Sequence, residues 1–82
     1  MKIDILTPEL SLYSGEASSI ILPGIAGQFQ LLENHAPIIA ALKKGTIEIK
    51  SDNGTKTIDI EDGFVECVKN NVSILIAGGK VN

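Results

Sequence analysis

The chain has 82 residues, of which 44% are hydrophobic, and ten acidic residues against seven lysines give it a net charge of −3. This length fits one domain, residues 1–82, built around a single hydrophobic core. Arginine is absent and the longest basic run is Lys43-Lys44, so the sequence lacks the basic footprint of a nucleic-acid-binding protein. The longest apolar stretch, Ile38 to Leu42, is far shorter than the ~20 residues of a membrane-spanning helix, and we expect no direct membrane insertion.

Alternation of apolar and polar residues predicts a series of short strands with one buried and one solvated face. In chain order, the apolar rows are Ile3 and Ile5, Leu10 and Leu12, Ile47 and Ile49, Ile58 and Ile60, and Val72, Ile74 and Ile76. The segment Ile20-Ile21-Leu22 is apolar on both sides, which is typical of a central strand or of one whose outer face meets a partner.

Turn-forming residues separate these rows. Ser51-Asp52-Asn53-Gly54 predicts a tight hairpin, because Asn-Gly readily takes positive φ angles. Glu61-Asp62-Gly63 and Asn70-Asn71 predict further turns, and Gly78-Gly79 predicts a frayed tail in place of a final strand. Turns spaced about ten residues apart predict an all-β sandwich or barrel.

Motifs that carry chemistry are missing. His35 is the only histidine and Cys67 the only cysteine, which excludes a multi-histidine metal site and an internal disulfide. We interpret Cys67 as a small buried hydrophobe. Gly24 and Gly27 fit neither a P-loop nor a dinucleotide-binding turn. The sequence therefore predicts no catalytic, cofactor-binding or metal site.

Apolar residues also gather near the turns of the first half of the chain. Some of them must be core, but a small sandwich has two outer faces, so others could form an exposed interface patch. The sequence leaves core and interface open for Ile25, Phe29, Leu31, Leu32, Ile38 and Ile39.

This region also carries a resemblance to a known family. Leu22-Pro23-Gly24-x-x-Gly27-x-Phe29, then His35-Ala36-Pro37, then Leu42-Lys43-x-Gly45-x-Ile47-x-Ile49 resembles the amino-terminal β-sandwich domain of the epsilon subunit of F-type ATP synthase. The similarity runs in order from about Lys2 to Ala77.

The resemblance implies a flattened sandwich of two antiparallel sheets with about eight to ten short strands. It implies a non-catalytic central-stalk (rotor) subunit that docks the gamma subunit to the c-subunit ring and supports rotary coupling of ion flow to ATP synthesis. Such a subunit lies at the cytoplasmic face of the bacterial inner membrane, as a peripheral part of the complex. The gamma-facing positions would be Thr7, Leu31, His35, Ile38, Ile39 and Ala40, and the ring-facing positions Ala26, Gly27 and Gln28.

The sequence departs from the family pattern in places. Glu33-Asn34 stands where many relatives have a proline, and the neutral Gln28 stands where many have an acid. Family members usually continue into an inhibitory two-helix hairpin, and we expect no such arm if the 82 residues are the complete product.

The sequence leaves two other classes of protein as alternatives. A lipoyl- or biotinyl-like carrier needs a modifiable lysine at a hairpin tip, for which Lys44 is the nearest candidate. A small-molecule-binding barrel or a generic protein-binding sandwich is the other alternative. An exposed gamma-binding patch also predicts weak self-association of the isolated chain.

Overall fold

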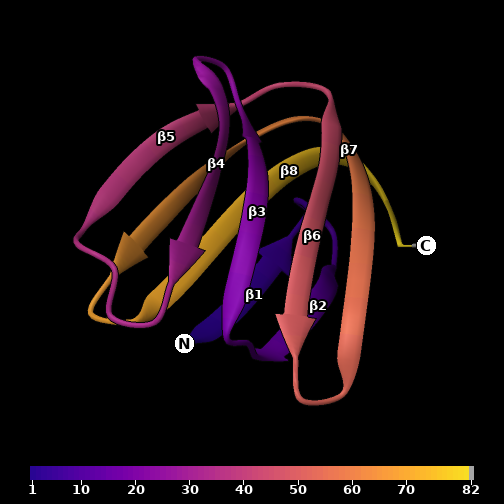
Figure 1. Ribbon diagram of the computed structural model, residues 1–82. Helices are drawn as coiled ribbons and strands as arrows, with labels where there is room; N and C mark the ends of the chain where they lie inside the picture. The colour runs from indigo at the N-terminus through magenta and orange to yellow at the C-terminus, as the bar shows by residue number, and fades with distance from the viewer. Residues whose placement is uncertain (82) are drawn as a thin grey trace.

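The computed structural model describes residues 1–81, and they form eight strands without a helix (Figure 1). The strands are β1 (Lys2–Leu6), β2 (Ser11–Glu16), β3 (Ser19–Gly24), β4 (Gly27–Leu32), β5 (Ile38–Leu42), β6 (Gly45–Ser51), β7 (Gly54–Val68) and β8 (Asn71–Val81). The predicted all-β class and strand number are confirmed. Within this part of the chain there is no helix that could cross a membrane.

The strands make two layers that share their longest members. One layer runs β2-β1-β8-β7-β5, and in the other β6 lies between β3 and β7, with β4 on the far side of β3 (Figure 1). The first half of β7 pairs with β6 and the second half with β5, so hydrogen bonding continues from one layer into the other. One pairing differs from the antiparallel expectation, because β1 and β8 run parallel.

The core lies between the layers and contains four of the five apolar rows that the alternation predicts. The fifth row is wrong in part, because Leu10 is 54% exposed and Leu12 is only partly buried against the core. Each of the other four rows points inward because successive side chains of a strand lie on opposite faces. The largest fully buried side chains are Ile3, Ile5, Ile20, Leu22, Leu31, Leu42, Ile47, Ile49, Ile58, Ile60, Val65 and Ile74. Cys67 is buried among them as expected, and burial raises the pKa of its thiol.

The turn predicted at Glu61-Asp62-Gly63 is wrong, because β7 continues through these residues. The buried positions change phase there: Ile58 and Ile60 point inward before it, and Gly63 and Val65 after it. The strand thus bends from one layer into the other. Gly63 makes the bend possible, since a Cβ at this position would lie 2.5 Å from the carbonyl oxygen of Leu75.

The frayed tail predicted from Gly78-Gly79 is also wrong. Residues Gly79 to Val81 pair with Ile60 to Ile58 of β7. Gly78 takes a φ of 62°, and a Cβ on Gly79 would lie 2.6 Å from the Leu12 side chain. The two glycines therefore let β8 follow the bend of β7.

The Asn53-Gly54 hairpin is confirmed, with Ser51 paired to Gly54 and a φ of 109° at the glycine. The turn expected at Asn70-Asn71 lies one residue earlier. Lys69 and Asn70 have φ angles of 50° and 67°, the positive pair that a type I′ hairpin requires.

Candidate functional site

The outer face of the layer that contains β1, β8, β7 and β5 carries a line of apolar side chains, of which Phe64, Leu75 and Ile25 are exposed and Leu6 and Ala41 half-buried. Leu6 pairs with Leu75, Leu75 with Phe64, and Phe64 with Ala41, so these four side chains lie next to each other across four strands. The backbone N–H of Ile25 donates to the carbonyl oxygen of Ala41 at 3.0 Å, which continues the line into the β3–β4 turn. We name Leu6, Leu75, Phe64, Ala41 and Ile25 the apolar row.

The apolar row is accessible to a partner. Phe64 is 62% exposed, Leu75 57% and Ile25 64%. Beside the row lies an open hollow of about 640 Å³ whose lining includes Pro8, Ala41, Asp62 and Phe64. Exposed apolar surfaces are typical of sites of protein association.

The residues that border the row include three acids. On one side the register aligns Asp4, Ser73, Glu66 and Ile39, of which Ile39 is 74% exposed. On the other side Asp62 pairs with Ala77. The face therefore combines an apolar centre with acidic edges.

The opposite outer face has a different character. Strand register places Gln30 and Glu48 on either side of Ile21, and Thr46 donates a hydrogen bond from Oγ1 to Oδ1 of Asp59 at 2.7 Å. Leu32 is the exposed large apolar residue on this face, at 53%. The two outer faces thus differ in polarity, and the apolar row belongs to only one of them.

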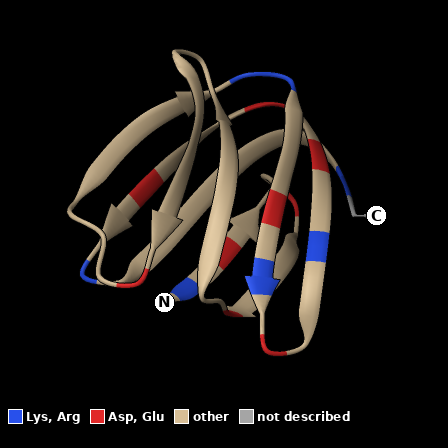
Figure 2. Ribbon diagram, in the orientation of Figure 1, with Lys and Arg blue, Asp and Glu red and all other residues tan. Residues whose placement is uncertain are grey.

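The β3–β4 hairpin projects from one end of the sandwich (Figure 1). Its tip exposes Ile25, Ala26, Gly27 and Gln28, and a φ of 135° at Gly27 explains the glycine there. Neither β3, β4 nor β5 contains a charged residue, as Figure 2 shows. The tip is therefore a small, neutral and accessible surface.

The predicted gamma-facing residues lie in different environments. Ile39 is exposed beside the apolar row, whereas its neighbours Ile38 and Ala40 point inward and pack against the core. Leu31 is fully buried and has no surface for a partner, so its place among the gamma-facing residues is withdrawn. Phe29 also packs against the core, while Ile25 and Leu32 are exposed.

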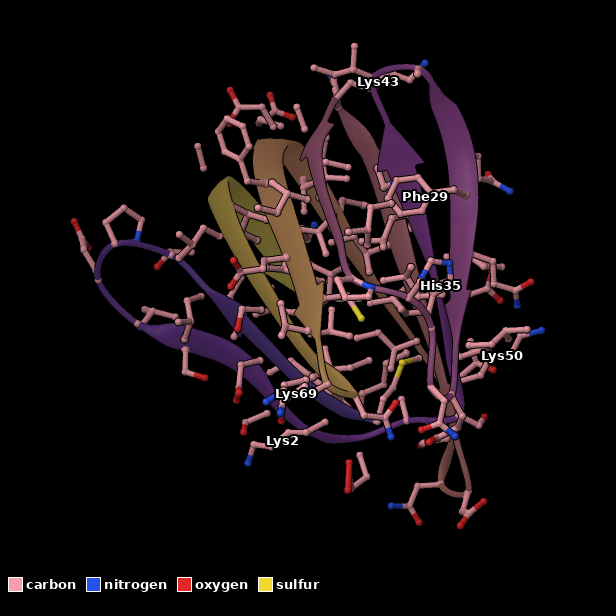
Figure 3. The ribbon with its side chains drawn as sticks, turned by 90° about the vertical axis from the view of Figure 1, so that its left-hand side faces the viewer. Lys2, Phe29, His35, Lys43, Lys50 and Lys69 are labelled. Atoms are coloured by element: carbon pink, nitrogen blue, oxygen red, sulfur yellow. The ribbon has the colours of Figure 1, made fainter. Side chains whose placement is uncertain are left out.

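Thr7 and His35 lie in connections between strands. The Oγ1 atom of Thr7 accepts hydrogen bonds from the backbone N–H groups of Glu9 and Leu10 at 3.3 and 3.1 Å, which shapes the β1–β2 loop. His35 is half-buried, with Nδ1 2.7 Å from the carbonyl oxygen of Ala36 (Figure 3). The hydrogen bonds of both side chains are made to residues close by in the sequence.

A polar network that the sequence did not reveal anchors the β4–β5 loop. The amino group of Met1 contacts the Glu33 carboxylate and donates to the carbonyl oxygen of Ala17 at 3.0 Å. Asn70 donates from Nδ2 to Glu33 at 2.9 Å and accepts from the backbone N–H of Asn34 at 2.8 Å. The hydrogen bonds from the amino group and Asn70 lower the pKa of Glu33.

The network also explains the strained backbone at this end of the molecule. Asn34 has a φ of 62° and Asn70 a φ of 67°, a region that asparagine tolerates better than most residues. The loop at Glu33-Asn34, where many relatives have a proline, is therefore held by hydrogen bonds of the Glu33 carboxylate and of the Asn34 backbone N–H to the Asn70 side chain.

The sequence analysis also missed Phe64, Leu75 and Leu6 as surface residues. Ile74-Leu75-Ile76 and Phe64-Val65 interrupt the apolar–polar alternation, so both faces of these strands are apolar. This loss of alternation was the sequence signal for an apolar outer face. It lies in the second half of the chain, where no interface residue was expected.

Comparison with known proteins agrees with this architecture. The family model described as the β-sandwich domain of the ATP synthase delta/epsilon chain matches residues 1–78. The ATP synthase epsilon chain of Chlorobium limicola is 45% identical over 76 residues, which are 92% of this chain and 85% of that one. The epsilon chain of Leptospira interrogans (strain Fiocruz L1-130) is 43% identical over 79 residues, and the match covers 96% of this chain but 62% of that relative.

Two solved structures share the fold at low sequence identity. A chain in the Euglena gracilis mitochondrial ATP synthase structure, which contains OSCP, F1 and the c-ring, superposes with a TM-score of 0.89 at 16% identity, covering 96% of this chain and 51% of that one. A chain in the central stalk and c-ring structure of the Tetrahymena thermophila mitochondrial ATP synthase gives 0.82 at 14% identity, covering 96% and 64%. From the family match and the bacterial relatives, the chain belongs to the β-sandwich domain family of the ATP synthase delta and epsilon chains.

Proposed function

We propose that this chain is a non-catalytic subunit of the central stalk of an F-type ATP synthase, where it holds the gamma subunit to the c-subunit ring. It would act at the cytoplasmic face of the bacterial inner membrane as a peripheral part of the complex. Family membership supports the assignment to the synthase. The exposed apolar row supports a role in adhesion.

The apolar row is the observation that carries the docking role. A stable protein–protein interface buries roughly 1,200–2,000 Å² in total, and a few well-packed side chains supply most of its energy. Phe64 lies in the middle of the row, with Leu75 on one side and Ala41 on the other. We therefore propose the face of β1, β8, β7 and β5 as the gamma-binding face, with Phe64 as its central anchor and Ile39 and Thr7 near its edges.

The β3–β4 hairpin tip is proposed as the contact with the c ring. Ala26, Gly27 and Gln28 are exposed there, and the tip lies at one end of the apolar row because Ile25 belongs to both. One partner can therefore cover the face while the other contacts the end. Since Gln28 is neutral, the ring contact would depend on shape and hydrogen bonding and need no charge pair.

A rotor part must also be stiff. The hydrogen-bonded strands continue from one layer into the other through β7, and the Met1–Glu33–Asn70 network ties the β4–β5 loop to two other connections. The loop that contains His35 is thereby held to the sandwich. This supports a domain that transmits force without changing shape.

The docking role is tested by Phe64→Asp, with Leu32→Asp as the matched control on the opposite face. Loss of a central anchor typically costs about 2 kcal/mol or more, which is about thirtyfold in affinity. We expect Phe64→Asp to weaken binding to the purified gamma subunit by at least that factor in titration calorimetry, while Leu32→Asp binds like the unmodified chain.

Both variants should keep the circular dichroism spectrum of the unmodified chain, because both side chains are more than half exposed. Equal affinities for gamma in the two variants would refute the proposed face.

A further inference from the structure

Charge is distributed unevenly around the apolar row. Asp4 and Glu66 lie in the row of residues on one side of it, and Asp62 lies on the other side. Asp62 and Glu66 are exposed. Asp4 is half-buried, and its Oδ1 accepts a hydrogen bond from Ser14 Oγ at 2.7 Å. Asp62 and Glu66 therefore stand at the edges of the face, where a partner's charges would meet them.

The lysine that comes nearest to these acids along the strands is Lys43, which follows Leu42, the partner of Gly63, and so lies at the same end of the sandwich as Asp62. No lysine belongs to the apolar row or to the two rows that border it. Figure 3 shows Lys43 at one end of the sandwich and Lys2 and Lys69 at the other. The acids on this face are thus not neutralised by cations of the same rows, and no ion pair is formed by Asp4, Asp62 or Glu66 among residues 1–81.

The shape of the row sets the shape of its occupant. Neighbouring strands lie about 4.8 Å apart, so Leu6, Leu75, Phe64 and Ala41 span about 15 Å at right angles to the strands. The hollow beside Phe64 and Ala41 adds depth along one side. An elongated apolar ridge fits this surface better than a single protruding side chain does.

We infer that the apolar row receives a partner surface in which an apolar ridge is flanked on both sides by lysine or arginine side chains. This inference rests on the proposed function, since it specifies the chemistry of the gamma surface that the row would bind. Complementary charges at the rim of an interface steer the encounter and fix its orientation. Basic side chains along the ridge would meet Glu66 on one edge and Asp62 on the other.

The same arrangement disfavours a second copy of this chain as the occupant. In a two-fold symmetric dimer the same patch faces itself, so the acidic edges of one copy would approach the acidic edges of the other. Like charges placed opposite each other at an interface are costly. The face therefore selects a basic partner, and the isolated chain should remain monomeric, in contrast to the weak self-association expected from an exposed patch alone.

The test compares a charge-reversed double variant, Asp62→Lys with Glu66→Lys, against a double variant of equal charge change, Asp52→Lys with Glu48→Lys, which lies away from the face. The probe is the gamma subunit of the same organism, and binding is measured at low and high salt. We expect the first variant to bind at least about tenfold more weakly at low salt, mainly through a slower association rate, and to approach the unmodified chain at high salt. The control variant should bind like the unmodified chain at both salt concentrations.

The outcomes separate this inference from the function on which it rests. If Phe64→Asp abolishes binding while the charge-reversed variant binds like the unmodified chain, the docking face stands and the basic flanks are refuted. If the unmodified chain does not bind gamma, the proposed function itself fails. A dimer in sedimentation equilibrium that Phe64→Asp dissociates would overturn the inference in favour of a second copy.

Discussion

At the scale of single residues, the Glu33 carboxylate is the most informative group in the molecule. It receives the amino group of Met1 and the side-chain amide of Asn70, and these contacts hold its pKa below the ordinary value of 4.5. A depressed pKa in the folded chain means that the ionised carboxylate contributes stability at pH values above the unfolded pKa. That contribution is lost as the pH falls through the folded pKa.

We therefore expect Glu33→Gln to lower the urea midpoint of unfolding at pH 7, with the difference from the unmodified chain shrinking below about pH 4.5. Urea titrations at a series of pH values measure this directly. Glu48→Gln, on the outer face of β6, is the control and should leave the midpoint nearly unchanged at neutral pH. A Glu33→Gln deficit of the same size at pH 3 and pH 7 would show that the carboxylate's charge is not what stabilises the loop.

At the scale of strands, β5 shows how one step along the chain separates core from interface. Ile38 pairs with Cys67 and points inward, whereas Ile39 pairs with Glu66 and points outward. If both isoleucines were replaced together, loss of gamma binding could not be distinguished from unfolding. Because the two side chains lie on opposite faces of β5, single substitutions distinguish the two effects.

We expect Ile38→Asp to destabilise the fold by about 2–4 kcal/mol, because it brings an unpaired charge against the core. Ile39→Asp should change stability by less than about 1 kcal/mol, yet weaken capture of gamma. Urea unfolding and gamma pull-down on the same two variants measure both quantities. A folded Ile38→Asp variant with unchanged stability would contradict the inward orientation of this side chain.

The same strand-scale view explains what could be predicted from the sequence. Alternating rows such as Ile47 and Ile49 were placed correctly because a period of two residues fixes which face is buried. The bend in β7 at Glu61-Asp62 was predicted wrongly as a turn. Along the sequence, a shift in which alternate residues are buried looks the same whether the chain turns or a continuous strand bends. The Gly78-Gly79 pair was misread as a tail in a similar way, because Gly78 takes a positive φ within the strand and Gly79 allows close packing against Ile76 and Leu12.

The candidate site was predicted in part for a related reason. The resemblance pointed to the β3–β4 hairpin tip and to Ile39, which are exposed. It missed Phe64 and Leu75, because they adjoin Ala41 only through pairing between distant segments. Register across four strands is a tertiary property, and a pattern read along the chain does not contain it.

At the scale of the whole molecule, two surfaces are held at fixed positions on one stiff block of about 27 × 27 × 20 Å. The hairpin tip with Gln28 lies at one end of the sandwich, and the β6–β7 turn with Asn53 lies at the other (Figure 1). If the tip meets the c ring, a reactive group at Gln28 should reach the ring and one at Asn53 should not.

This geometry predicts the outcome of cross-linking in the assembled synthase. A Gln28→Cys variant carrying a short thiol-directed photo-cross-linker should form a product with the c subunit, and Asn53→Cys should form little or none. The native thiol gives low background because Cys67 is 1% exposed and its pKa is raised by burial, both of which suppress thiolate reactivity. Equal yields from both positions would mean that the tip is not oriented toward the ring, and the proposed ring contact at Ala26, Gly27 and Gln28 would then be refuted.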